Sequence, residues 1–211
     1  AFVYPNLGVD VIPDVKPNER KVGEPLRILF AGRLLGWKGV HFAIRALAEA
    51  RRNGVDVELT ILGRGPYEPV LRKLATSEGI EQSIRWLGHR PQSELFAIYR
   101  SMHTFIFPSL HDSGGTVVLE AQANAWPVIC IDWGGRATLG TGDTAIVVST
   151  RNQDENGVVL GLVSAIEQLA GDEPRRAEMG RLALMHAGTT MTWESRACGV
   201  LTLVQGVRVG S

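Results

Sequence analysis

The sequence predicts an α/β fold, in which a mostly parallel sheet of about six strands lies between two layers of helices. Three observations support this prediction. Short apolar runs alternate with segments of helical periodicity, the connections between them are short, and glycine or proline marks most boundaries. Parallel strands joined by helical crossovers are buried on both faces, so their apolar character is expected. We therefore expect a Rossmann-like three-layer sandwich.

The predicted strands are short and almost continuously apolar. They cover residues 26–32, 55–63, 84–88, 105–107, 128–131 and 145–148. In such a sheet, ligands bind where the carboxyl ends of the strands meet the amino ends of the helices. The loops expected to form that edge are 32–39, 63–66, 88–91, 108–116 and 132–137.

The predicted helices follow from apolar residues spaced three and four apart. They cover residues 39–53, 67–77 and 92–102, a segment starting near Thr116, and 155–170, 174–187 and 192–205. Gly54 is expected to end the first helix. Pro66 is expected in the first turn of the second, and Pro91 to open the third.

The chain is predicted to hold one domain, residues 26–211, behind a lead-in or linker of residues 1–25 that contains four prolines. It begins with alanine rather than methionine, and we expect it to be part of a longer protein. Lys and Arg total 22, as do Asp and Glu, so the net charge is +0. Without a bulk basic field, nucleic-acid and membrane-surface binding are not expected, and an anion must be held locally.

Several site classes find no support in the sequence. The two cysteines are too few for a disulfide framework, and Cys130 is interpreted as a buried free thiol, which fits a reducing compartment. Histidine, cysteine and acidic residues lack metal-ligand spacing. The dinucleotide fingerprint and the phosphate loop ending in lysine and serine or threonine are absent, as is a nucleophile elbow. No apolar run approaches the ~18 residues of a membrane span.

Two loops of the expected binding edge carry chemistry suited to a phosphate. Arg33 and Lys38 place two cations on the loop after the first strand, and a guanidinium and an ammonium suit a diphosphate. After the fourth strand, the glycines 114 and 115 allow close backbone approach, and the helix beginning near Thr116 adds free N–H groups. Glu120, one turn further on, could accept hydrogen bonds from ribose hydroxyls.

Other residues are less informative. Gly63 and Gly65 allow close backbone approach in the loop after the second strand, although a plain turn is as good an interpretation. His111 could touch a ligand, whereas the other histidines are interpreted as structural. Among the tryptophans, those at 37 and 133 could line a sugar or base pocket, and those at 86, 126 and 193 are predicted to be core residues.

These motifs, in this order, resemble the C-terminal, donor-binding domain of GT-B fold retaining glycosyltransferases, the large family 4 group. The matching segments are Pro5–Asp10, Gly32–Gly39, Leu62–Pro66, Asp112–Glu120 and Trp193–Glu194. The fourth matches an E-x7-E motif with Asp as its first acid. Three departures are visible: that Asp is one methylene shorter than Glu, Leu7 interrupts the linker motif, and Ala125 stands where glycine is expected.

The resemblance implies residue roles. Arg33 and Lys38 would neutralise the leaving diphosphate, and Asp112 would contact donor-sugar hydroxyls near the reacting carbon; these three would take part in catalysis. Glu120 would hold the ribose. The remaining binding residues would supply close backbone approach or backbone contacts, with the backbone around Leu87 edging the base; these residues are Gly32, Gly63, Gly65, Leu87, Gly114, Gly115 and Thr116.

The resemblance also implies a function for the whole protein. A hexose would pass with retention from a nucleoside-diphosphate sugar to a glycan or lipid-linked acceptor, without a cofactor or an obligatory metal. A missing N-terminal domain would bind the acceptor, so this chain would be inactive alone. The protein would be cytoplasmic, with any membrane contact at the inner face through that domain. Three alternatives remain open: a non-catalytic sugar-nucleotide-binding module, another GT-B enzyme such as a sugar-nucleotide epimerase, and a structural domain without ligand.

Overall fold

A computed structural model describes residues 8–10, 14–111, 116–133 and 142–208. Its centre is a six-stranded sheet with the strand order β3-β2-β1-β4-β5-β6, and all five strand pairs are parallel. The strands are β1 (Leu26–Ala31), β2 (Val57–Leu62), β3 (Ile84–Gly88), β4 (Thr104–Phe107), β5 (Val128–Ile131) and β6 (Ala145–Val148). The predicted Rossmann-like fold is confirmed.

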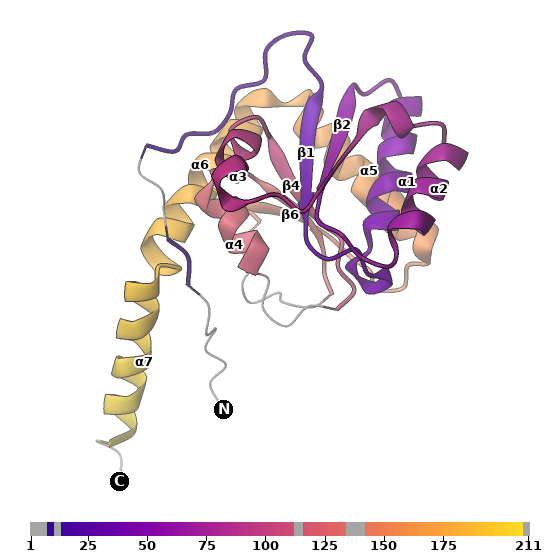
Figure 1. Ribbon diagram of the computed structural model, residues 1–211. Coiled ribbons are helices and arrows are strands. Elements are labelled where there is room, and N and C mark those ends of the chain that lie inside the picture. Colours follow the sequence, from indigo (N-terminus) through magenta and orange to yellow (C-terminus); the bar gives the residue numbers. More distant parts are fainter. Residues whose placement is uncertain (1–7, 11–13, 112–115, 134–141, 209–211) are drawn as a thin grey trace.

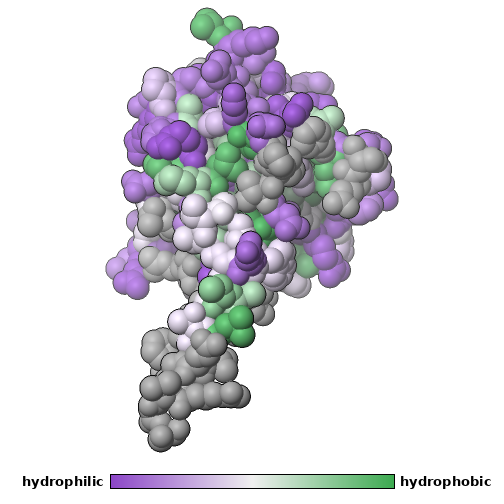
Figure 2. Space-filling model, turned by 90° about the vertical axis from the view of Figure 1, so that its left-hand side faces the viewer, coloured by the Kyte–Doolittle hydropathy of each residue, from purple (hydrophilic) through white to green (hydrophobic). Residues whose placement is uncertain are grey.

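Helices cover both faces of this sheet (Figure 1). One layer is formed by α1 (Val40–Arg52), α2 (Glu68–Ser77) and α5 (Glu155–Gly171), and the other by α3 (Gln92–Tyr99), α4 (Thr116–Ala123) and α6 (Glu173–Thr190). Short 3₁₀ turns, η1 (Gly36–Lys38) and η2 (Glu81–Ser83), precede α1 and β3. The last helix, α7 (Trp193–Arg208), projects away from the body. Figure 2 shows the molecule from this side.

The alternation of side chains along each strand divides the core between the two layers. Ile28 and Phe30 of β1 pack with α1 and α5, whereas Leu29 packs with β4 and with Val118 of α4. Cys130 is buried in the second of these clusters and is not part of a disulfide, as predicted. Because the strands are covered on both faces, apolar residues occupy both sides of each strand.

Three details of the predicted elements are wrong. The third helix ends at Tyr99 rather than near residue 102. Pro66 lies in a turn before α2, and Pro69 occupies the first helical turn instead. Trp193 was predicted in the core, but it is 54% exposed, because it stands at the start of the projecting helix, where a Cβ on Gly8 would lie 2.6 Å from its ring.

The described part of the lead-in is anchored to the domain. The Val9 amide donates to the carbonyl of Met191 at 2.8 Å, and the Val9 side chain is buried beside Leu119 and Met191. Further along, the Asn18 amide donates to the carbonyl of Met102 at 2.6 Å, and Arg20 donates to that of Ala170 at 2.6 Å. Within the described ranges, every helix is too short or too polar to cross a bilayer.

Candidate functional site

The candidate site lies at the carboxyl edge of the sheet, where the strand order reverses between β1 and β4. The loops after these two strands are held together there. The Leu110 amide donates to the carbonyl of Trp37 at 2.8 Å. Gly39 has φ +68, and a Cβ at this position would lie 1.9 Å from the carbonyl oxygen of Pro108. Glycine is therefore required where α1 begins.

The loops after β1 and β2 are equally close. A Cβ on Gly63 would lie 1.9 Å from the carbonyl oxygen of Gly32, and one on Gly65 would lie 2.1 Å from that of Leu34. The Leu34 amide donates to the carbonyl of Arg64 at 3.0 Å. The sequence predicted that these glycines allow another backbone to approach closely. In the structure that backbone is the loop after β1, and its contacts fix the backbone of residues 63–65.

A cavity of about 420 Å³ opens over the ends of β1, β2 and β3. Three arginines line it: Arg33 after β1, Arg64 after β2 and Arg90 after β3. The Arg90 guanidinium is held by the carbonyl of Leu87 at 3.0 Å and the carboxylate of Glu94 at 3.3 Å. The rest of the lining is apolar or backbone apart from His89, and it includes Gly32, Gly63, Gly88 and Val117. Such a lining suits an anion.

A second cavity, of about 760 Å³, adjoins the first, since His89, Arg90 and Leu95 line both. Thr116 and Glu120 of α4 face it together, as their spacing predicts. Although Glu120 is exposed to solvent, partial burial raises the pKa of its carboxyl. Burial also raises the pKa of the Tyr99 hydroxyl, and the charge of Glu120 raises it further. A carboxyl with a raised pKa that lines a cavity is a candidate for a binding site.

The structure brings together only some of the predicted site residues. Gly32, Arg33 and Gly63 line the first cavity, and Thr116 and Glu120 line the second. Gly65, Lys38 and Leu87 lie at the same edge but line neither of these two cavities, and the same holds for Trp37 and Trp133. Asp112, Gly114 and Gly115 lie outside the described residues.

Sequence reasoning missed Arg64 and Arg90 as residues of this cavity, and it interpreted His89 as structural, although His89 is exposed and lines both cavities. His89 is the first residue after β3, and Arg64 and Arg90 are the second residues after β2 and β3. That position was the available signal, because loops at the carboxyl ends of parallel strands converge.

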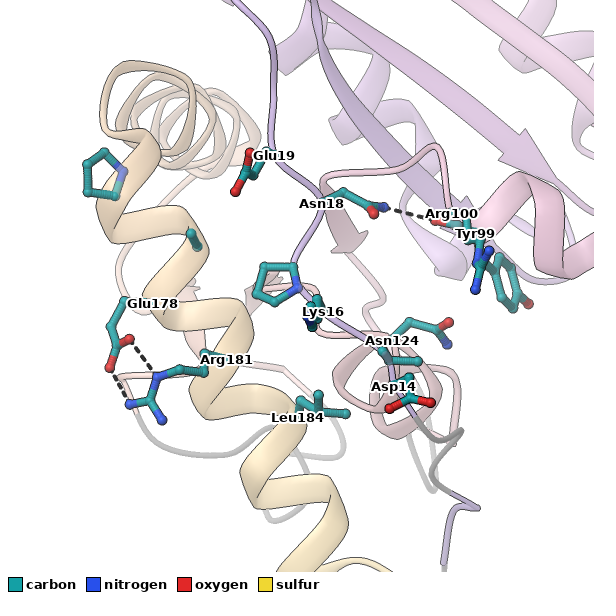
Figure 3. A pocket seen from close by; sticks show the side chains of 14 residues that line it. Asp14, Lys16, Asn18, Glu19, Tyr99, Arg100, Asn124, Glu178, Arg181 and Leu184 are labelled. Carbon is teal, nitrogen blue, oxygen red and sulfur yellow. Dashed lines mark hydrogen bonds and ion pairs between the residues drawn. The ribbon is translucent and has the colours of Figure 1, made fainter.

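The largest described cavity, of about 900 Å³, is at the opposite edge of the sheet (Figure 3). It lies between the lead-in segment 14–19, the end of α3 and α6. Several of its polar groups are engaged in the domain's own contacts: Arg181 is paired with Glu178 at 2.6 Å, and Asn18 donates to the carbonyl of Met102. Cations and acids are mixed in its lining. Size alone does not make it the functional site.

Solved structures share the fold of this chain. The pneumococcal O-GlcNAc transferase GtfA, crystallised with UDP and GlcNAc, matches with a TM-score of 0.74 and 20% identity over 93% of this chain and 39% of that one. Anabaena HepE, in complex with UDP and glucose, matches with a TM-score of 0.74 and 20% identity, covering 87% and 49%. The C-terminal domain of LpcC, a group 1 glycosyl transferase from Francisella tularensis, matches with a TM-score of 0.71 and 18% identity, covering 85% and 96%.

Curated relatives are similar in sequence. A D-inositol 3-phosphate glycosyltransferase of Corynebacterium aurimucosum is 34% identical over 84% of this chain and 43% of its own length. A glycogen synthase of Mycobacterium tuberculosis is 29% identical over 82% and 41%. The chain thus spans less than half the length of these relatives. The model of the family described as glycosyl transferases group 1 matches residues 11–183, and the chain therefore belongs to this family of glycosyltransferases.

Proposed function

We propose that this chain is the donor-binding part of a retaining glycosyltransferase and holds a nucleoside-diphosphate sugar at the carboxyl edge of its sheet. One observation carries the proposal: a cavity rich in arginine and backbone, without a lining carboxylate, adjoins a second cavity in which Thr116 and Glu120 face the same space. The relatives crystallised with UDP and a sugar support it, because they share this fold.

The chemistry required of the site is stabilisation of charge on the departing nucleoside diphosphate. Arg33 and the point charge of Lys38, fixed beside η1, would meet that charge as it develops. The amino end of α4 would add N–H donors and a positive dipole end. Glu120, one turn further along α4, would accept hydrogen bonds from the ribose, and Asp112 would contact the hydroxyls of the sugar.

Transfer would need a further domain, which binds the acceptor. This chain matches less than half the length of its curated relatives, which supports a division of the activity between two parts of a longer protein. We propose that a hexose is transferred with retention to a glycan or lipid-linked acceptor held by another part of a longer protein. The chain alone should then bind nucleotide but show little or no transfer. Turnover by the purified chain with added acceptor would contradict this division of roles.

The first experiment is a thermal-shift panel of the chain with UDP, GDP, ADP and CMP, each beside a sugar-activated form where one exists. We expect one nucleoside diphosphate to stabilise the protein, by about 2.7 kcal/mol at a hundredfold excess over the dissociation constant. The shift should shrink in Lys38→Ala and persist in EDTA, because the proposed site uses no metal. Arg175→Ala, which removes an exposed cation from α6, is the matched control. A panel without any shift would contradict the proposed function.

A further inference from the structure

Arg64 lines the arginine-rich cavity but has no role in the proposed function. Its backbone is held between Gly63 and Gly65, which press against the carbonyl oxygens of Gly32 and Leu34. Its carbonyl accepts from the Leu34 amide at 3.0 Å. The side chain extends from this fixed turn and lines the cavity.

The guanidinium of Arg64 rests over Gly88 at the end of β3. A Cβ on Gly88 would lie 3.0 Å from Nε and 3.4 Å from Nη2 of Arg64, so the absence of a side chain at Gly88 leaves room for the guanidinium. Gly88 has φ +64, and its carbonyl accepts from the Gly63 amide at 2.8 Å. The arrangement therefore depends on glycine both next to Arg64 and beneath its side chain.

Within the described ranges, neither Arg33 nor Arg64 has an ion-pair partner, whereas Arg90 is paired with Glu94. An exposed arginine without a carboxylate partner contributes little to the stability of the fold. The charges of Arg33 and Arg64 are therefore available for a ligand. In a sugar nucleotide each phosphate carries one ester and one anhydride linkage, so each has a single negative charge. The terminal phosphate of a free nucleoside diphosphate has only the anhydride linkage, and its second ionisation, with a pKa of about 6, adds a negative charge at neutral pH.

We propose that Arg64 is a further anion-binding residue of this site and that it favours the nucleoside diphosphate over the sugar nucleotide. The inference rests on the proposed function and specifies its charge selectivity. The guanidinium would pair with the additional charge of the terminal phosphate, through two parallel hydrogen bonds. In a complete enzyme the site would hold the product more tightly than the donor, so the departing diphosphate would inhibit the reaction.

The test is calorimetric titration of the chain with the nucleoside diphosphate that gives the largest thermal shift and with its matching sugar nucleotide: UDP and UDP-glucose, GDP and GDP-mannose, or ADP and ADP-glucose. Arg64→Ala should weaken binding of the nucleoside diphosphate about tenfold and that of the sugar nucleotide about threefold or less. Arg64→Lys keeps the charge and should keep part of the preference. Gly88→Ala should displace the guanidinium and reproduce part of the loss. Arg175→Ala should change neither affinity.

The outcomes separate this inference from the proposed function. If the parent chain binds both ligands and Arg64→Ala weakens both equally or neither, the selectivity assigned to Arg64 is wrong and donor binding stands. If the parent binds no nucleoside diphosphate and no sugar nucleotide of the three pairs, the proposed function fails and the inference fails with it. Circular dichroism of each variant shows that the fold is retained.

Discussion

The two edges of the sheet use charged side chains in opposite ways. At the amino edge, Arg176 is 1% exposed and donates to the carbonyl of His103 at 3.1 Å and to that of Asn18 at 2.7 Å, and it also pairs with Glu173. At the carboxyl edge, Arg33 and Arg64 are exposed and have no ion-pair partner among the described residues. The amino edge thus holds Arg176 in the domain's own contacts, whereas the carboxyl edge leaves Arg33 and Arg64 available.

This difference separates stability from binding. Removing a paired, buried charge leaves its partners unsatisfied, whereas removing an exposed charge without a partner costs the fold little. Burial raises the pKa of the Glu173 carboxyl, but hydrogen bonds from Arg176 and from the Arg20 amide more than offset this, and the net pKa is lowered. Variants at the amino edge should therefore change the free energy of unfolding, and variants at the carboxyl edge should change affinity.

The largest effect is expected for Arg176→Leu. It leaves the carbonyls of His103 and Asn18 without their donor and weakens the attachment of the lead-in, so the free energy of unfolding should fall by about 3–5 kcal/mol. Urea denaturation measures the change, with Arg175→Leu on the exposed face of the same helix as control. At a temperature where the variant is folded, nucleotide affinity should match that of the parent. A loss below about 1 kcal/mol would contradict the structural role.

The second effect is a pH dependence due to His103. Burial, followed by the charges of Arg176 and Arg27, lowers the pKa of this imidazole from 6.5 to about 4, and its Nδ1 accepts from the Arg27 amide at 3.0 Å. Because the folded pKa is the lower one, the stabilisation is complete above pH 6.5 and is lost as the pH falls towards 4. The loss should reach about 3 kcal/mol.

Denaturation at a series of pH values measures this slope. His103→Asn keeps an acceptor for the Arg27 amide but does not titrate in this range, so its stability should vary less between pH 6.5 and 4. Parallel curves for parent and variant would show that other groups cause the acid sensitivity.

The third effect appears in binding. Arg33→Ala removes a charge-assisted hydrogen bond of ~1.5–3 kcal/mol and should weaken binding of the preferred nucleotide by roughly 10–150-fold. The free energy of unfolding should stay within about 0.5 kcal/mol of the parent. Titration calorimetry and denaturation of the same preparation give both values. Affinity equal to that of the parent would show that Arg33 does not bind the nucleotide. A large loss of stability would show that Arg33, like Arg176, has a structural role.

The smallest effect is expected for Glu120→Gln. Burial raises the pKa of Glu120, so the folded state disfavours the charged carboxylate. The carboxyl therefore stabilises the fold below its unfolded pKa, and this contribution is lost as the pH rises through the folded pKa. At neutral pH, Glu120→Gln should therefore stabilise the fold by about 0.5 kcal/mol or less, as solvent screens an exposed group. Nucleotide binding should weaken at the same time. Destabilisation with unchanged affinity would contradict a binding role.

Local patterns account for most of the elements predicted correctly. Alternating apolar runs and helical periodicity located the six strands, and Gly54, with φ +87, ends the first helix as expected. The expectation of glycine at position 125 also has a physical basis, because Ala125 has φ +57, a conformation that costs an L-residue about 1–2 kcal/mol. The prediction that Trp193 is a core residue was wrong, because an apolar side chain at the start of a helix does not indicate what the helix packs against.

The tertiary structure and the sequence point to partly different sets of candidate site residues. Arg33 and Glu120 were identified because their residue types and loop positions suit a phosphate and a ribose. Arg64 and Arg90 were missed because an arginine in a surface turn looks the same whether it faces solvent or a cavity. Their role depends on the approach of β2 and β3 to β1, which no local pattern encodes.

The sequence by itself determined that this protein has alternating strands and helices with phosphate-type chemistry after the strands, because periodicity and residue type are local properties. Only the tertiary structure decided which charges are paired and which are free. Arg176 and Arg64 are chemically identical, but the crossovers bury one against three partners and leave the other over a glycine at the mouth of a cavity. Long-range packing, not side-chain identity, places one in the domain's own contacts and leaves the other exposed at the carboxyl edge.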